Sequence, residues 1–102
     1  MNRPTEFRPN AIALTIAGSD PSGGAGLQAD LKTFQQFGVY GASAITMVTV
    51  QNTLGVRRVE ALPTELVIEQ IDAVLDDLKP VVAKTGALGN AELIDAIHHR
   101  AQ

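Results

Sequence analysis

A glycine-rich loop between an apolar run and an amphipathic segment is the feature that most constrains this sequence. Residues 11–17 are almost continuously apolar, and the stretch 18–30 that follows contains Gly23, Gly24 and Gly26. Glycine has no Cβ, so this cluster allows a tight bend and a close approach of the backbone to a ligand. The N–H groups at the start of the next helix are expected to point into the same space. Polar residues lie beside the glycines, namely Ser19, Asp20 and Ser22. The pattern favours a ligand-binding loop between a strand and a helix; the alternative is a connection that only turns the chain.

Apolar runs alternate with helical stripes along the rest of the chain. Strands are predicted at 11–17, 42–50, 56–62 and 81–85, and helices at 26–37, between Pro63 and Pro80, and after Asn90. The run at 42–50 is rich in β-branched residues, whereas charges interrupt the third run, which indicates an exposed edge strand. Thr64 and Asn90 are candidate N-caps, and Gln70 is assigned to the solvent side of its helix. The order β-α-β-β-α-β-α predicts an α/β fold with a mostly parallel sheet flanked by helices.

Three polar or glycine-rich stretches follow predicted strands. They are residues 18–26, 51–55 and 86–89. In an open parallel sheet, ligands bind beyond the carboxyl ends of the strands. We therefore expect these three stretches to meet at one edge of the sheet and to form a single site there.

Composition and charge exclude several classes of protein. The 102 residues have a formal net charge of -3 and scattered Lys and Arg, so the sequence indicates no basic face for nucleic acid. Cysteine is absent, which excludes a disulfide framework and a thiolate metal site. No apolar run approaches the roughly 20 residues that span a bilayer, and the polar residues 1–10 lack the apolar core of a signal peptide. We expect a cytoplasmic protein with a loose leader at 1–10, one α/β unit over 11–102, and no nucleic-acid or membrane partner.

The loop also matches part of a dinucleotide-binding pattern. The segment 24–29 fits G-x-G-x-x-A, but the acidic residue expected after the second strand is missing, since 49–52 are Thr, Val, Gln and Asn. A dinucleotide-binding domain therefore stays open as a minor alternative. No glycine precedes a Lys-Ser or Lys-Thr pair, which excludes a Walker A loop. His98 and His99 are adjacent on a helix and point in different directions, so no metal site is predicted there.

Four side chains near the loop and the strand ends are candidate ligand-binding groups. Asp20 lies in the loop, and Asp30 either orders the loop, binds a ligand or is a solvated residue beside Lys32. Gln51 offers one acceptor and two donors, which suits the edge of a heterocycle, or it is a turn residue. Lys84 is unexpected in an apolar run, so it either pairs with an acid or binds an anionic ligand.

Four segments with consistent spacing together resemble a known family. The segments are 13–33, 41–46, 48–53 and 84–86. The first is similar to the N-terminal signature of the hydroxymethylpyrimidine/phosphomethylpyrimidine kinases of thiamine biosynthesis, and the other three match later parts of that family. The resemblance covers essentially all of residues 11–100, and a match of this length is far more specific than G-x-G-x-x-A.

The resemblance implies a ribokinase-like fold, of which this chain is the N-terminal portion. It implies transfer of the γ-phosphoryl group of ATP to 4-amino-5-hydroxymethyl-2-methylpyrimidine and then to its monophosphate, with Mg²⁺, in an enzyme that is a homodimer at full length. The substrate-binding residues that it implies are Gly18, Asp20, Gly26, Asp30, Thr49, Gln51 and Ala87. Among these, Gln51 is expected to read the aminopyrimidine edge, while the backbone of Gly18 and the Asp30 carboxylate hold the ring and its hydroxymethyl arm.

Two departures from the family pattern affect these expectations. Position 87 is Ala, where the family usually has a larger methionine, so one wall of the pocket is expected to be looser. The residues correspond to roughly the first two-fifths of such an enzyme. The family's later half has a glycine-rich anion hole, a Cys or Asp base and most ATP and Mg²⁺ contacts, and it has no counterpart here. No catalytic residue is therefore expected in these 102 residues, which are expected to be inactive alone. A non-catalytic pyrimidine-binding module is the competing interpretation.

Overall fold

Strand β1 (Ile12–Ala17) lies at the centre of a three-stranded parallel sheet, between β2 (Tyr40–Ile45) and β5 (Val82–Thr85). The computed structural model describes residues 10–101. All but the first residue of β1 are buried, as expected for a strand with helices on both of its faces. The leader predicted at 1–10 lies outside the described residues, except for Asn10, which is exposed.

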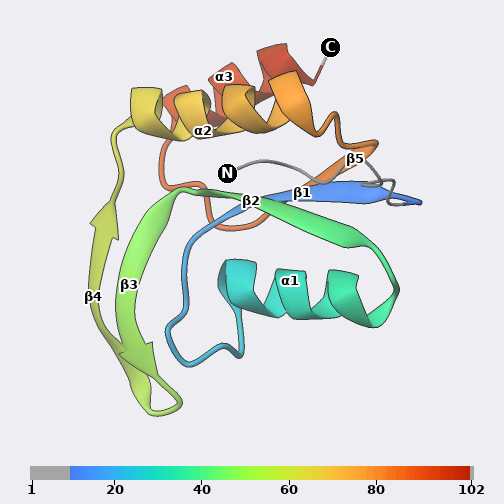
Figure 1. Cartoon of the computed structure of the whole chain (residues 1–102). Coiled ribbons are helices and arrows are strands. Elements are labelled where there is room, and N and C mark those ends of the chain that lie inside the picture. The colour runs from blue at the N-terminus through green and yellow to red at the C-terminus, as the bar shows by residue number, and fades with distance from the viewer. Residues whose placement is uncertain (1–9, 102) are drawn as a thin grey trace.

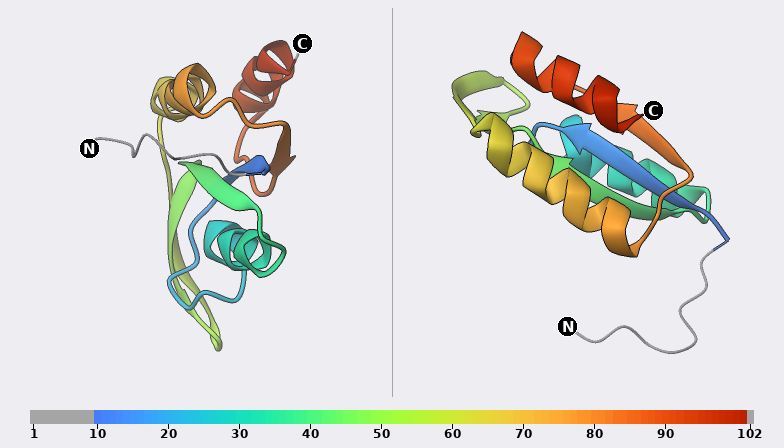
Figure 2. Two further views of the ribbon diagram at one scale, coloured as in Figure 1. Left: turned by 45° about the vertical axis from the view of Figure 1, so that its right-hand side comes forward. Right: turned by 90° about the horizontal axis from the view of Figure 1, so that it is seen from above.

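Three helices cover the two faces of this sheet. Helix α1 (Gly26–Gln36) lies on one face, and α2 (Thr64–Asp77) and α3 (Ala91–Arg100) lie on the other (Figures 1 and 2). The core cluster consists of buried aliphatic side chains: Leu14, Ile16, Ala42, Ala44, Val67, Ile71 and Leu93. Fully burying one large aliphatic side chain stabilises a fold by about 1.5–3 kcal/mol. The apolar stripes on α2 and α3 therefore hold these helices against the sheet, and the predicted α/β fold, a mostly parallel sheet flanked by helices, is confirmed.

The single strand predicted at 42–50 is wrong. Strand β2 ends at Ile45, and a separate strand, β3 (Met47–Asn52), begins after Thr46 and leaves the parallel sheet. It pairs antiparallel with β4 (Gly55–Ala61) in a two-stranded hairpin beside the sandwich (Figure 1). The order is therefore β-α-β-β-β-α-β-α, and the chain is not wholly parallel. The sequence does not mark the break, because strand-forming residues continue across it without Gly or Pro.

The hairpin agrees with one sequence expectation. Every residue of β4 is exposed, as predicted for an edge strand interrupted by charges. Its pairing with β3 shifts register between Val50 and Gln51, where Arg58 and Val56 are the respective partners. The intervening Arg57 is the additional residue of a β-bulge, a feature that bends the strand that contains it.

A glutamine on α2 stabilises the end of β2. The Gln70 Nε2 donates to the Ile45 carbonyl at 2.9 Å, and its Oε1 accepts from the Ile45 N–H, also at 2.9 Å. The side-chain amide thus replaces a neighbouring strand at the point where the chain turns away from the sheet. The sequence-based assignment of Gln70 to the solvent side of its helix is wrong, because period 3.6 places a residue on a face but does not show which backbone lies beside it.

The helix ends match the predicted caps in one case of two. Asn90 Oδ1 accepts a hydrogen bond from the Leu93 N–H at 2.7 Å, which confirms it as the N-cap of α3. Thr64 is not a cap, because it is already the first residue of α2 and Pro63 occupies the N-cap position without a side-chain bond. Over residues 10–101, no helix combines the length and the apolar character that crossing a bilayer requires.

We expect Gln70→Met to lower the free energy of unfolding by about 1–3 kcal/mol, because it leaves the N–H and carbonyl groups of Ile45 without partners. Urea unfolding followed by circular dichroism measures this effect. The matched control is Glu69→Met at the exposed neighbouring position on α2, which is expected to have little effect. Equal stability of Gln70→Met and the control would contradict the assigned role of Gln70.

Candidate functional site

A cavity of about 230 Å³ lies beside the loop that follows β1, between the hairpin and the end of β5. Its lining consists of residues from these three elements: Gly18, Ser19, Asp20, Ala25, Gly26, Met47, Thr49, Gln51, Lys84, Gly86 and Ala87. All the expected substrate-binding residues except Asp30 are among them. The stretches 18–26 and 86–89 therefore meet as predicted. The third stretch, 51–55, contributes only Gln51, because the rest of it forms the tip of the hairpin, that is, the turn and the strand residues beside it.

The carboxylate of Asp20 organises the glycine-rich loop. Its Oδ1 accepts from the Ser22 N–H at 2.9 Å and from the Ser22 hydroxyl at 2.6 Å, and its Oδ2 accepts from the Ala25 N–H at 2.9 Å. The hydrogen bond from the Ser22 hydroxyl is the main cause that lowers the pKa of Asp20. Burial opposes it, and backbone N–H groups of the loop add to it. Asp20 is only 4% exposed, so this side chain serves the loop even though it borders the cavity.

Two backbone N–H groups at the start of α1 are hydrogen-bonded within the chain. Asp20 accepts from the N–H of Ala25, and the carbonyl of Gly18 accepts from the N–H of Leu27 at 2.9 Å. Gly26 has a φ of 63°, and a Cβ there would lie 2.4 Å from the Gly18 carbonyl oxygen. The expectation that these N–H groups face a ligand is therefore wrong for Ala25 and Leu27. The close approach that the glycines permit is between two parts of the loop.

Strand β3 presents alternate side chains to the cavity. Met47, Thr49 and Gln51 line it, whereas the residues between them are exposed, as the two-residue period of a strand requires. Ser19 joins the loop to this strand. Its N–H donates to the Met47 carbonyl at 2.9 Å, and its own carbonyl accepts from the Thr49 hydroxyl at 2.6 Å. Met47 was not predicted as a site residue. The sequence did contain a signal for it, because Met47 lies four positions before Gln51 and therefore on the same face of a strand.

The hydrogen bonds of Gln51 leave part of its amide available. Its Nε2 donates to the Thr49 hydroxyl oxygen at 2.7 Å. Within residues 10–101, no hydrogen bond reaches Gln51 Oε1. The amide is therefore oriented by its neighbour on the strand, and it retains an acceptor and a second N–H for a ligand.

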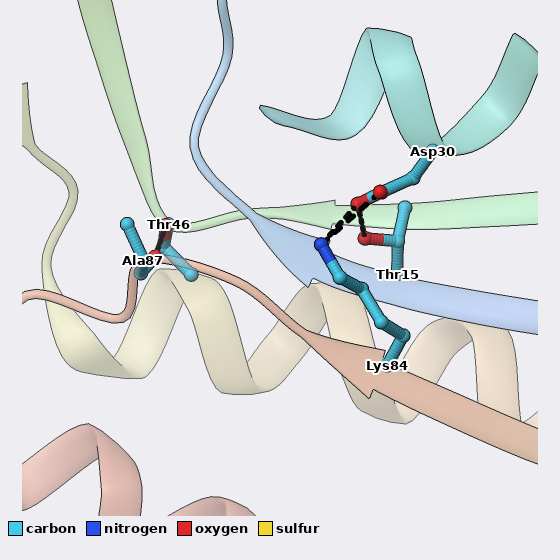
Figure 3. Close-up of polar contacts among 5 residues, drawn as sticks. All are labelled: Thr15, Asp30, Thr46, Lys84 and Ala87. Atoms are coloured by element: carbon cyan, nitrogen blue, oxygen red, sulfur yellow. Dashed lines mark hydrogen bonds and ion pairs between the residues drawn. The ribbon is translucent and has the colours of Figure 1, made fainter. Parts of the chain in front are cut away.

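Asp30 forms an ion pair with Lys84, which lines the cavity (Figure 3). The Lys84 Nζ lies 3.1 Å from Oδ1 and 2.9 Å from Oδ2 of Asp30, and the Thr15 hydroxyl donates to Oδ2 at 2.7 Å. Partial burial tends to raise the pKa of Asp30. The hydrogen bonds from Thr15 and Lys84 and the charge of Lys84 outweigh that effect, so the pKa is lowered. Asp30 is neither a lining residue nor a freely solvated one, and Lys84 both pairs with an acid and borders the cavity.

Thr46 fixes the loop after β5. Its hydroxyl donates to the Ala87 carbonyl at 2.7 Å (Figure 3), and the Gly86 N–H donates to the Ile16 carbonyl at 2.8 Å. Thr46 is only 1% exposed. No special role was predicted for Thr46, because threonine is common among strand-forming residues and its partner is not visible in the sequence. The backbone that presents the small side chain of Ala87 is thus held in place.

The described residues offer no metal centre. No group of three or more His, Cys, Asp or Glu side chains lies close enough together to hold a metal ion in the part of the chain that the structure covers. The carboxylates nearest the cavity, Asp20 and Asp30, are already bonded to Ser22, Ala25, Thr15 and Lys84. The described residues therefore supply no preformed set of ligands for Mg²⁺, and no chemical step is assigned to that ion here.

Comparison with known proteins identifies similar sequences. The family model described as phosphomethylpyrimidine kinase matches residues 20–102. The hydroxymethylpyrimidine/phosphomethylpyrimidine kinase of Bacillus subtilis (strain 168) is 60% identical over 85 residues, which are 83% of this chain and 31% of that protein. The chain spans about a third of the length of the curated relatives it matches.

Solved structures show the same architecture. The crystal structure of phosphomethylpyrimidine kinase from Clostridium difficile 630 superposes with a TM-score of 0.83 at 50% identity, over 88% of this chain and 39% of that one. The pyridoxal kinase from Staphylococcus aureus in complex with AMP-PCP and pyridoxal gives a TM-score of 0.76 at 39% identity, over 87% and 35% of the two chains. The chain therefore has part of the ribokinase-like fold that the sequence resemblance implied.

We expect Asp20→Asn to lower the midpoint of thermal unfolding at pH 7. The carboxylate accepts hydrogen bonds at both oxygens, whereas an amide has an NH₂ group in place of one oxygen, so one loop N–H group loses its acceptor. The folded pKa of Asp20 lies below its ordinary value of 3.8. The stabilisation of the folded protein by ionised Asp20 is therefore complete above the ordinary pKa. It is lost as the pH falls through the lower pKa of the folded state. Scanning calorimetry at several pH values is expected to show the wild-type advantage shrinking below about pH 4.

The control for this prediction is Asp76→Asn at an exposed position of α2. It replaces the same side chain outside the loop, and we expect only a small change in the midpoint. If Asp20→Asn and Asp76→Asn shift the midpoint equally at every pH, Asp20 does not organise the loop.

Proposed function

Because this chain belongs to the phosphomethylpyrimidine kinase family, we propose that it supplies the pyrimidine-binding part of a cytoplasmic enzyme of thiamine biosynthesis. The enzyme transfers the γ-phosphoryl group of ATP to 4-amino-5-hydroxymethyl-2-methylpyrimidine and then to its monophosphate. The observation that carries the proposal is the cavity in which Gly18, Thr49, Gln51 and Ala87 meet. These residues come from the loop after β1, the hairpin and the loop after β5, so a ligand there contacts the three elements at once.

Gln51 is the group that recognises the ring edge in this proposal. An aminopyrimidine presents an exocyclic N–H donor beside a ring nitrogen acceptor, and a primary amide presents the complementary acceptor and donor. Thr49 accepts one N–H of Gln51, which fixes the amide plane and leaves Oε1 and the second N–H for the ring. Asp30 contributes through Lys84, whose ammonium group it holds at the border of the cavity.

Phosphoryl transfer relies mainly on positioning and on stabilisation of charge. The residues described here position the acceptor substrate, and no side chain among them is proposed as the catalytic base. ATP supplies the phosphoryl group when it is bound. The complex of a related pyridoxal kinase with AMP-PCP, an analogue of ATP, supports this choice of donor. A homodimer is proposed for the full-length enzyme by the same family membership, as are its Mg²⁺ contacts outside these residues.

A pyrimidine-binding module without catalysis is the second candidate. The observation that favours it is that the two carboxylates nearest the cavity, Asp20 and Asp30, are already engaged in hydrogen bonds. A dinucleotide-binding domain is not proposed, because the acidic residue expected after its second strand is missing. In addition, two of the N–H groups at the start of α1, those of Ala25 and Leu27, are bonded within the chain.

We expect Gln51→Leu, in the full-length protein that contains this chain, to raise the KM for the pyrimidine roughly 5- to 150-fold. Losing hydrogen bonds to a buried polar ring edge leaves the ring's groups unpaired, which corresponds to that range. The KM for ATP is expected to stay unchanged, since Gln51 belongs to the pyrimidine pocket. Steady-state kinetics with each substrate varied in turn measure both values. The matched control is Gln36→Leu at the exposed end of α1, and an unchanged pyrimidine KM in Gln51→Leu would remove Gln51 from the site.

We expect the 102-residue chain alone to show no ATP-dependent phosphorylation of the pyrimidine. Removing one preorganised donor from a transition state already costs on the order of 10²–10³ in rate. No described side chain at the cavity is free to act as a base. A coupled assay for ADP release tests this, with the Bacillus subtilis relative as the positive control. Turnover by the 102 residues would show that the catalytic groups lie within them.

A further inference from the structure

The lining of the cavity is mostly polar or made of very small residues. Among the described lining residues, Met47 is the only large apolar side chain; Ala25 and Ala87 contribute single methyl groups. An aromatic ring bound there has polar partners for its edge, namely Gln51 and Thr49, which lie on the same face of β3 as Met47. Among the described lining residues, only Met47 offers an extended apolar surface to the face of such a ring.

The side chain of Met47 lies between two loops. A Cβ on Gly18 would come within 2.7 Å of Met47 Cγ, and a Cβ on Gly89 would lie 3.3 Å from Met47 Cε. The side chain therefore runs from the loop after β1 towards the loop after β5, and glycine at position 18 leaves the space that it occupies. The backbone beneath it is fixed, because the Ser19 N–H donates to the Met47 carbonyl. Met47 is half-buried, so one side of it packs on the loops while the other borders the cavity.

We propose that Met47 is a specificity-determining residue that contacts the bound ring directly. Its thioether and terminal methyl group form the surface on which the face of an aminopyrimidine lies, while Gln51 binds the edge of the same ring. Sulfur–aromatic contacts are favourable, and the flexible methionine side chain adapts to the shape of its partner. The small side chain of Ala87 leaves room in the cavity for this arrangement. This inference rests on the proposed function, since it names a contact of the same ligand.

The direct test is a methyl NMR experiment on the 102-residue chain. The sequence contains two methionines, so labelling the methionine methyl groups with ¹³C gives at most two signals, and Met47→Leu identifies that of Met47. Adding 4-amino-5-hydroxymethyl-2-methylpyrimidine is expected to shift the Met47 signal upfield, because a methyl group over an aromatic face experiences the ring current. Inorganic phosphate, which has no ring, is the control ligand and is expected to leave the signal in place.

Calorimetric titration of the same ligand gives the second measurement. We expect Met47→Ala to weaken binding of the pyrimidine roughly 3- to 30-fold and Met47→Leu to retain most of it, because leucine keeps the apolar surface. The matched control is Val48→Ala on the opposite face of β3, where the side chain is 45% exposed and does not border the cavity. It is expected to bind the pyrimidine like the wild type.

The outcomes separate this inference from the proposed function. Binding by the wild-type chain with an upfield shift of the Met47 methyl supports both. Binding without that shift, or equal affinity in Met47→Ala and Val48→Ala, overturns the contact and leaves the pyrimidine site standing. Absence of any binding by the wild-type chain overturns the proposed site and the contact with it.

Discussion

The hydrogen bonds of Thr46 are the interactions on which the site depends. The N–H of Thr46 donates to the Ala17 carbonyl, its carbonyl accepts from the Leu62 N–H, and its hydroxyl donates to the Ala87 carbonyl. A buried polar group without a partner costs about 1–3 kcal/mol, so a chain that leaves a parallel sheet in the protein interior needs such partners. Thr46 provides them at the point where β2 ends. It thereby holds the ends of β1 and β5 beside the strand that faces the cavity.

The glycine-rich loop satisfies part of its own backbone, and this limits the groups that are left for a ligand. Asp20 and the Gly18 carbonyl accept from N–H groups at the start of α1. Among the side chains that line the cavity, Gln51 of the hairpin and Lys84 of β5 present polar groups to a ligand. Lys84 is oriented by Asp30, which lies 54 positions earlier in the chain. The ion pair of Asp30 and Lys84 joins α1 to β5. It holds the Lys84 ammonium group at the border of the cavity.

The sequence predicted the helices and most strands because their signals are local. Apolar runs, helical stripes of period 3.6, the cap at Asn90 and the charged edge strand β4 are all signals carried by residues close together in the chain. Local features also led to the prediction that the loop after β1 and Gln51 belong to one site, and both border the same cavity. The family resemblance added a prediction of the ligand, an aminopyrimidine, because several matching segments contain more information than composition or periodicity does.

The tertiary structure alone decided the break at Thr46, the role of Gln70 and the place of Met47. Gln70 bonds Ile45, which is 25 positions away, and the hydroxyl of Thr46 bonds Ala87, which is 41 positions away. A hydrophobic period shows that a side chain faces inward or outward, but the atom it meets there depends on how the strands are ordered. Asp30 shows the same limit, because its type and spacing allowed a ligand contact, a loop contact or a surface position. Packing β1 between β2 and β5 brought Lys84 to it, and that juxtaposition is a property of the topology and not of any local segment.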